Sequence, residues 1–206
     1  MLPLLAGPVT PVDVPASQLI DQSAPIRLKL HIQRATLDVL DGRSATVTGT
    51  LRPSLGGRRV DLQRRASHGW RTIAHSATGI RGRFTLRYAP RRLLIEQVRV
   101  LFPGDAGDRR AARDVGALRV YRVAGASWYG GGGSLACGGQ LTSSTMGVAN
   151  KTLPCGTLVT LRYRERRVRV PVIDRGPYVA GREFDLTEAT KRVLGFEGVG
   201  DVWSTR

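Results

Sequence analysis

The sequence predicts an all-β protein in two parts, a β-sandwich followed by a small β-barrel with one short helix. Between residues 26 and 122, apolar residues recur at every second position in short runs, as in strands with one buried face. Turn signals rich in Gly, Asp and Pro separate these runs at intervals of roughly 8–12 residues. The length of 206 residues and the hydrophobic fraction of 41% are sufficient for each part to form its own hydrophobic core.

Residues 1–25 lack this period and are interpreted as an N-terminal segment or linker. The apolar start, Met1 to Gly7, has no basic residue and is too short to cross a membrane, so we expect no transmembrane segment. A signal peptide or lipid anchor in a longer precursor is left open.

Residues 26–123 are expected to form the sandwich, with about seven strands in about one hundred residues. The alternating runs are Ile26–Leu30, Ala45–Leu51, Val60–Leu62, Phe84–Tyr88, Val98–Phe102 and Leu118–Val120. The stretches 79–88 and 98–105 resemble immunoglobulin-like modules of secreted bacterial proteins, which implies a spacer or wall-binding domain. His31, His68 and His75 have no carboxylate cluster beside them in the sequence, so we predict no metal site.

Residues 125–206 are expected to form the barrel. Its predicted strands are Thr157–Tyr163, Val168–Ile173 and Val199–Trp203. The helix is predicted to start at the capping-box spacing of Asp185 and Glu188 and to stop at Gly195. Three residues of this helix are expected to face the core: Ala189, Val193 and Leu194.

The charge is strongly positive, at a formal +16 from 32 basic and 16 acidic residues. Residues 1–123 hold 21 basic and 9 acidic residues, a net +12, so the charge lies mainly on the first part. It favours anionic partners, such as an anionic wall polymer. The arginines alternate with apolar residues along strands, which is also typical of a solvated sheet face. Because no nucleic-acid recognition motif accompanies them, we expect no specific nucleic-acid partner.

The two cysteines, Cys137 and Cys155, both lie in the second part and lack further ligands at zinc spacing. In an exported protein they would form a disulfide worth about 3 kcal/mol in the chain-entropy model. Two buried free thiols are the alternative interpretation.

Two acids follow apolar runs in the second part. Asp174 comes directly after Val172-Ile173 and precedes the Gly176-Pro177 turn, and Asp185 follows Phe184. A carboxylate at an apolar strand end is partly desolvated, which raises its pKa and suits it to proton transfer. Each acid also has a structural interpretation: Asp174 as the cap of its turn and Asp185 as the cap of the helix.

Several motifs in the second part occur in a characteristic order. They are Ala126-Ser127-Trp128-Tyr129-Gly130, Ala136-Cys137-Gly138-Gly139, Gly147 to Thr157 with Lys151-Thr152-Leu153-Pro154, Val172 to Tyr178, and Phe184-Asp185-Leu186-Thr187. Together they resemble the RlpA-like (rare lipoprotein A) family, related more distantly to expansins and barwin. The resemblance implies a six-stranded double-psi β-barrel over residues 125–203 and extends to no residue before 125.

The family resemblance implies an exported, cell-envelope protein that contacts peptidoglycan glycan strands. Some members are lytic transglycosylases, in which an acid protonates the glycosidic oxygen and the C6 hydroxyl of the sugar replaces water; no metal or cofactor is required. By this resemblance Asp174 is the catalytic acid and base and Asp185 the second acid. The predicted substrate-binding residues are Trp128, Tyr129, Asn150, Arg175 and Tyr178. Arg175 is also a candidate ion-pair partner of either acid, which would lower the acid's pKa.

One position departs from the family pattern. Many active members have His before Lys-Thr-Leu-Pro, where this chain has Asn150. Asn forms hydrogen bonds but transfers no proton. Two functions therefore remain: a septal-ring-type lytic transglycosylase, which we favour, and a non-catalytic, expansin-like glycan-binding module.

Overall fold

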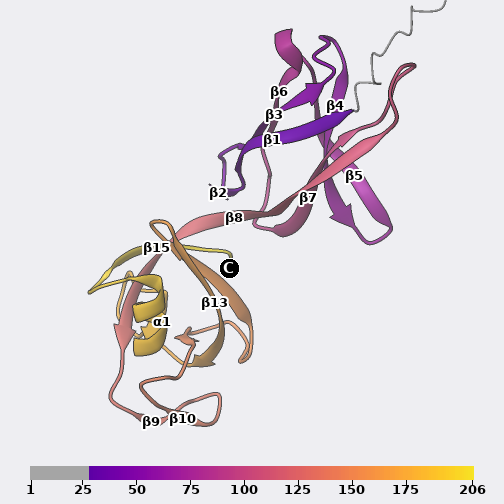
Figure 1. Cartoon of the computed structure of the whole chain (residues 1–206). Helices are drawn as coiled ribbons and strands as arrows, with labels where there is room; N and C mark the ends of the chain where they lie inside the picture. The colour runs from indigo at the N-terminus through magenta and orange to yellow at the C-terminus, as the bar shows by residue number, and fades with distance from the viewer. Residues whose placement is uncertain (1–27) are drawn as a thin grey trace, which may run out of the picture.

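The computed structural model describes residues 28–206, so the predicted segment 1–25 lies outside the described residues. The chain is mostly β-structure with one short α-helix, in two parts joined by a long strand (Figure 1). No helix among residues 28–206 has the length and apolar character needed to cross a membrane.

The first part consists of two β-sheets. Strands β1, β3 and β6 form one sheet, and β5, β4, β7 and β8 form the other, with β2 paired to β8. The elements are β1 (Lys29–Thr36), β2 (Asp38–Leu40), β3 (Ala45–Arg52), β4 (Arg59–Ala66), β5 (Gly69–Ala77), the short 3₁₀ turn η1 (Ile80–Gly82), β6 (Arg83–Tyr88), β7 (Ile95–Phe102) and β8 (Ala111–Tyr129).

The two sheets share one hydrophobic core. Leu51 and Leu86 of the first sheet are fully buried, as are Leu62, Val100 and Leu118 of the second. These residues are the apolar members of the alternating pattern, because successive side chains of a strand point to opposite faces. The predicted sandwich is confirmed, and its immunoglobulin-like classification stays a prediction.

Strand β8 belongs to both parts. Its first half pairs with β7 and β2, and its second half pairs with β15 (Gly200–Ser204) and β14 (Phe184–Thr187). The predicted boundary between residues 123 and 125 therefore falls inside a continuous strand (Figure 1). Asp38 of β2 reinforces this junction, accepting hydrogen bonds from the Tyr121 hydroxyl at 3.2 Å and from Arg167 of the second part at 2.8 Å.

The second part is a closed barrel. In the described chain, six strands form a ring in the order β14-β11-β13-β12-β15-β8, which β14 closes by pairing with β8. The pairs β11–β13 and β14–β8 are parallel, and the other four are antiparallel. The remaining elements are β9 (Gly133–Ser134), β10 (Gln140–Leu141), β11 (Val148–Ala149), β12 (Leu158–Tyr163), β13 (Arg166–Asp174) and α1 (Glu188–Leu194).

The start of helix α1 differs from the sequence prediction. Its N-cap is Thr187, whose hydroxyl accepts a hydrogen bond from the Thr190 N–H, and Asp185 lies in strand β14 instead. Pairing with β8 extends β14 to Thr187, so the helix begins two residues later than the capping-box spacing indicates. Gly195 ends the helix in the left-handed conformation, as predicted. The prediction that Val193 faces the core is wrong: its side chain is exposed.

Candidate functional site

Four neighbouring strands of the barrel bring the two predicted acids into one row. Ser127 of β8 lies opposite Asp185 of β14, Asp185 opposite Ala149 of β11, and Ala149 opposite Asp174 of β13. The Cα atoms of the acids are thus two strand spacings apart, about 10 Å. In this row a single residue, Ala149, separates the two acids.

A β-bulge places Asp174 in this row. Val148 pairs with Val172, but the next residue, Ala149, pairs with Asp174, so Ile173 is left over. If the strand continued in regular alternation without a bulge, Asp174 would point to the same side as Val170 and Val172, whose side chains belong to the barrel core. Bulges re-aim side chains in this way next to functional sites. Here the bulge turns the carboxylate out of the core and towards Asp185.

Asp185 is half-buried, and its environment favours the protonated form. Burial raises the pKa of this carboxyl, and the neighbouring Asp174 raises it further. A hydrogen bond from the Ser127 hydroxyl at 2.8 Å and the charge of Arg182 oppose this effect without cancelling it. The pKa of Asp185 therefore lies above its usual value, which agrees with the expectation for an acid behind an apolar residue.

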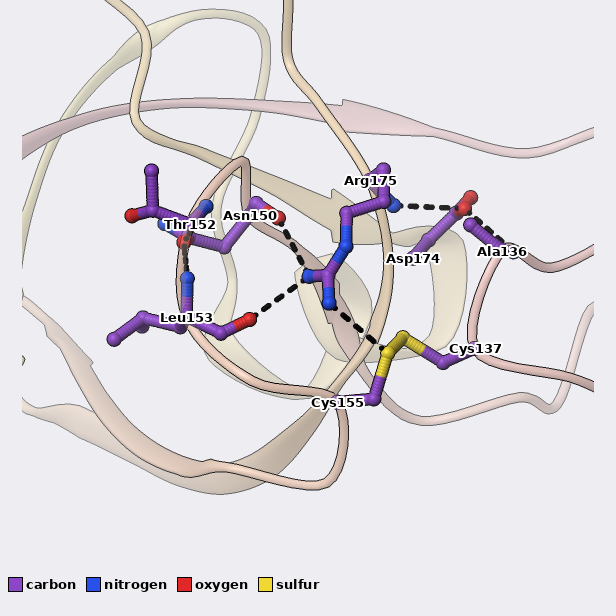
Figure 2. Close-up of a disulfide and its surroundings, with 8 residues drawn as sticks. All are labelled: Ala136, Cys137, Asn150, Thr152, Leu153, Cys155, Asp174 and Arg175. Carbon is purple, nitrogen blue, oxygen red and sulfur yellow. Dashed lines mark hydrogen bonds between the residues drawn. A yellow bond between two sulfur atoms is a disulfide. The ribbon is translucent and has the colours of Figure 1, made fainter.

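Asp174 is held by the backbone on both sides. Its Oδ1 accepts hydrogen bonds from the N–H of Arg175 at 2.8 Å and from the N–H of Ala136 at 2.9 Å (Figure 2). The first bond belongs to the predicted turn, whereas the second comes from a loop 38 residues earlier in the chain. The carboxylate thus has a fixed orientation before any ligand binds.

A disulfide fixes the loop that contacts Asp174. Cys137 and Cys155 are bonded, with their Cα atoms 5.6 Å apart, which confirms the predicted pairing. The Cys137 N–H also donates to the carbonyl of the bulged Ile173 at 3.2 Å. The disulfide therefore joins the 135–139 loop to the 150–155 loop (Figure 2), and the Cys137 hydrogen bond joins it to the strand end that carries the acid.

Tyr129 places a hydroxyl beside the acids. Burial raises the pKa of this hydroxyl well above its usual value, and the adjacent Asp174 carboxylate raises it further. The oxygen is buried and has no hydrogen-bond partner of good geometry among the described residues. Because this oxygen is closed off from solvent, its available acceptor is the Asp174 carboxylate, and hydrogen bonding to it also contributes to the raised pKa. Besides the predicted stacking on a sugar ring, Tyr129 could therefore act through its hydroxyl.

Arg175 does not pair with either acid, which corrects the expectation of an ion pair. Its guanidinium donates to the carbonyl oxygens of Asn150 at 3.0 Å and Leu153 at 2.8 Å, and it contacts the sulfur of Cys155 at 3.1 Å. Figure 2 shows the side chain directed away from the Asp174 carboxylate. Arg175 therefore holds the 150–155 loop in place and forms no ion pair with either acid.

Asn150 is buried and its side chain bonds to the backbone. Its Oδ1 accepts from the N–H groups of Thr152 at 3.0 Å and Leu153 at 2.8 Å, and its Nδ2 donates to the Glu183 carbonyl at 3.0 Å. Only 3% of the residue is exposed. These contacts give Asn150 a role in shaping the loop and do not support its predicted contact with a sugar.

The two remaining predicted residues are accessible to a ligand. Tyr178 is 80% exposed and Trp128 39% exposed. The Lys191 ammonium lies 3.8 Å from the centre of the Trp128 ring, so a cation already covers part of this aromatic surface. Tyr178, in the turn after Asp174, is therefore the freer of the two for stacking on a sugar ring.

Two residues of the site were not predicted from the sequence. Ser127, which donates to Asp185, lies within the Ala126-Ser127-Trp128-Tyr129 motif, but only its position opposite Asp185 reveals its role. Gly147 packs so closely against the bulged Ile173 that any side chain at position 147 would overlap it. Among residues 28–206 no three His, Cys, Asp or Glu side chains are grouped so as to hold a metal ion.

The closed six-stranded ring with two parallel pairs defines the second part as a double-psi β-barrel. The model of the family described as "Lytic transglycolase" matches residues 122–203. Residues 122–203 are therefore an RlpA-like double-psi barrel domain, as the motifs predicted.

Relatives among curated proteins resemble the same region. "Probable endolytic peptidoglycan transglycosylase RlpA" of Aquifex aeolicus is 43% identical over 75 residues, which cover 34% of this chain and 33% of the relative. The protein of the same name from Synechocystis sp. is 37% identical over 95 residues, covering 42% and 30%. The similarity thus spans about a third of each relative. Among solved structures, the Streptomyces papain inhibitor is 27% identical and covers 40% of this chain and 91% of its own, with a TM-score of 0.34, too low for a structural conclusion.

Proposed function

We propose that the barrel is a peptidoglycan lytic transglycosylase that uses the Asp174–Asp185 row as its active site. The observation that carries this proposal is the β-bulge at Ile173, which turns Asp174 out of the core and into register with Asp185. The names of the relatives, endolytic peptidoglycan transglycosylases, support the same substrate and reaction. The disulfide supports a location outside the cytoplasm, where such bonds persist.

The proposed reaction needs one group that first donates and then accepts a proton. A carboxylic acid protonates the glycosidic oxygen as the C1–O bond breaks. The resulting carboxylate then removes the proton of the C6 hydroxyl, whose oxygen attacks C1 to close a 1,6-anhydro ring. The acid is regenerated and no water is consumed. Neither a metal nor a cofactor enters this scheme.

We assign the proton transfer to Asp174 and an assisting role to Asp185. Asp174 is pre-oriented by two backbone N–H groups, which fits a group that must meet a specific oxygen. Asp185 retains its proton to higher pH because burial raises its pKa, so it can donate a hydrogen bond to a sugar oxygen. The same raised pKa makes Asp185 the competing candidate for the general acid, and single variants separate the two assignments.

A glycan-binding module without catalysis is the second candidate function. It is favoured by Asn150, which occupies the position of the usual His and directs its side chain to backbone groups. An amide held in this way supplies no proton to the reaction. In this case Asp174, Asp185 and the exposed Tyr178 would bind a glycan strand without cleaving it.

Purified sacculi, with and without stem peptides, provide the test. The full chain and its Asp174→Asn and Asp185→Asn variants are incubated with sacculi, and both bound protein and released muropeptides are measured. Because Asn keeps the size of Asp and its ability to accept hydrogen bonds, these variants remove the proton transfer with little change of shape. Arg71→Gln, an exposed change on β5 of the other part, serves as the control.

The proposal predicts release by the wild type and the control, and a loss of release of at least 100-fold in Asp174→Asn with binding retained. A loss of that size in Asp185→Asn, with Asp174→Asn nearly unaffected, would instead assign the proton transfer to Asp185. Binding without release by every protein, at every pH between 5 and 8, would reject the enzyme in favour of the binding module.

A further inference from the structure

The outer face of the three-stranded sheet β1–β3–β6 carries a dense set of cationic side chains. Leu51 of β3 and Phe84 of β6 point into the sandwich core, so their neighbours in sequence point outward. Arg52 and Arg83 are two of these neighbours, and both are exposed. This face is far along the chain from the barrel acids and takes no part in the function proposed above.

Strand register gathers these side chains into two rows. Lys29 of β1 lies opposite Arg52 of β3, and in the next outward row His31 lies opposite Thr50, which lies opposite Arg83. These residues border a surface hollow of about 550 Å³, which we call the basic hollow. Its lining consists of Lys29, His31, Gln33, Thr50, Arg52, Arg81 and Arg83.

Among residues 28–206 the cations of the basic hollow have no acidic partners. No ion pair joins Lys29, Arg52, Arg81 or Arg83 to any acid among residues 28–206, and the lining contains no carboxylate. Some arginines elsewhere in the sandwich are neutralised by acids: Arg58, for example, bonds two aspartates at 2.8 Å each. Four like charges around one hollow repel one another, and an anion bound there would relieve this repulsion.

The backbone holds Arg81 in place at an energetic cost. Arg81 has φ 62° within η1. This is the left-handed region, which residues other than Gly rarely adopt because it costs about 1–2 kcal/mol of backbone strain. The following Gly82 packs so tightly on the carbonyl of Leu51 that any side chain there would collide with it. The turn is therefore fixed to the end of β3, and it presents an arginine at the rim of the hollow.

We propose that the basic hollow binds a linear polymer of phosphate groups that carries no aromatic bases. Arginine matches phosphate with its planar set of donors, and every side chain of the lining can donate a hydrogen bond. Single-stranded nucleic acids are usually held by aromatic side chains on which bases stack, and the lining contains none. The open sheet face instead allows a polymer to run along the strands, where alternate outward residues recur about every 7 Å.

Binding measurements with the full chain test this site. Two probes carry phosphate chains, inorganic polyphosphate and poly(glycerol phosphate), and a duplex DNA of equal charge is the comparison. The site variant combines Arg81→Gly, which keeps the left-handed backbone without strain, with Arg83→Gln. The control variant combines Arg43→Gln with Arg71→Gln, two exposed arginines outside the hollow, and so has the same net charge. Thermal melts of both variants verify that they fold.

We expect the site variant to lose at least 10-fold in affinity for both phosphate polymers, and the control variant less than about 3-fold. The slope of log affinity against log salt should fall by about two in the site variant, one for each lost phosphate contact. Whichever polymer binds more tightly identifies the natural source of the phosphate chain. Equal losses in the two variants would overturn the site. Tighter binding of duplex DNA than of both polymers would overturn the ligand class.

Discussion

The bulge that orients Asp174 depends on the absence of a side chain at Gly147. A methyl group at this position would lie 2.5 Å from Cγ1 and 3.1 Å from Cγ2 of Ile173, and closer still to Cδ1. Ile173 is β-branched and stiff at χ1, so it relieves this overlap only by moving the backbone of the bulge. Gly147 has no positive φ, so a substitution by Ala tests packing alone.

We predict that Gly147→Ala lowers the free energy of unfolding by about 1–3 kcal/mol, the usual cost of an overpacked site. Truncation of the neighbour should relieve the overlap. In the double variant Gly147→Ala/Ile173→Ala the cost should therefore be smaller than the sum of the two single costs by about 1 kcal/mol or more. Urea unfolding followed by tryptophan fluorescence measures all four proteins of this cycle. Under the function proposed above, Gly147→Ala also reduces muropeptide release, because Asp174 is displaced.

The matched control is Gly79→Ala. Gly79 has φ −90°, and the nearest atom to an added methyl group is the Arg83 carbonyl oxygen at 3.8 Å. Its stability should change by no more than about 0.5 kcal/mol. A Gly147→Ala variant as stable as the wild type, or simple additivity of the two substitutions at residues 147 and 173, would show that Gly147 and Ile173 do not pack in this way.

Three further predictions concern the acids and their supports. The pKa of Asp185 is higher in the folded state than in the unfolded state, so its carboxyl stabilises the fold at low pH, and this stabilisation is lost as the pH rises through the folded pKa. The Asp185→Asn variant should therefore have a higher melting temperature than the wild type at pH 7, with a much smaller difference at pH 3. Tyr129→Phe removes a buried hydroxyl that makes no hydrogen bond of good geometry among residues 28–206, so urea unfolding should show a stability that is unchanged or higher by about 1 kcal/mol. The Cys137→Ser/Cys155→Ser variant should lose about 3 kcal/mol in urea unfolding, and hydrogen exchange at the Ala136 N–H, which bonds Asp174, should accelerate.

Each of these has a contrary outcome. An equal change of melting temperature at both pH values would contradict the raised pKa of Asp185. A loss of more than 1 kcal/mol in Tyr129→Phe would show that the hydroxyl donates a bond that stabilises the fold. Unchanged exchange at Ala136 after removal of the disulfide would show that the loop is held by other contacts.

The alternating strands could be predicted from the sequence, but features that depend on which strands pair in the folded protein could not. Alternation identifies the inward residues of β3 and β6, since each strand has one buried face. The stretch Val172-Ile173-Asp174, however, reads as an uninterrupted strand, and only its parallel partner β11 reveals that Ile173 is bulged. Local pattern carries no information on which neighbour a strand will have, so the register of the two acids could not be predicted.

The helix start shows the same limit at a single residue. Both Asp185 and Thr187 are residue types that cap helices, and the Glu at position 188 favours Asp185. Parallel pairing with β8 decides the competition, because it holds Asp185 and Leu186 in strand conformation. The consequence for function is direct: an Asp185 that is not a cap keeps its carboxyl free to face Ser127 and Asp174.

Mass spectrometry of the fragments released from sacculi distinguishes transglycosylation by Asp174 from hydrolysis and from binding alone. We predict that the wild-type chain releases muropeptides ending in a 1,6-anhydro sugar, lighter by one water than the hydrolysis product, and that Asp174→Asn releases none. Fragments that end in a reducing sugar, or anhydro fragments released equally by Asp174→Asn, would contradict it.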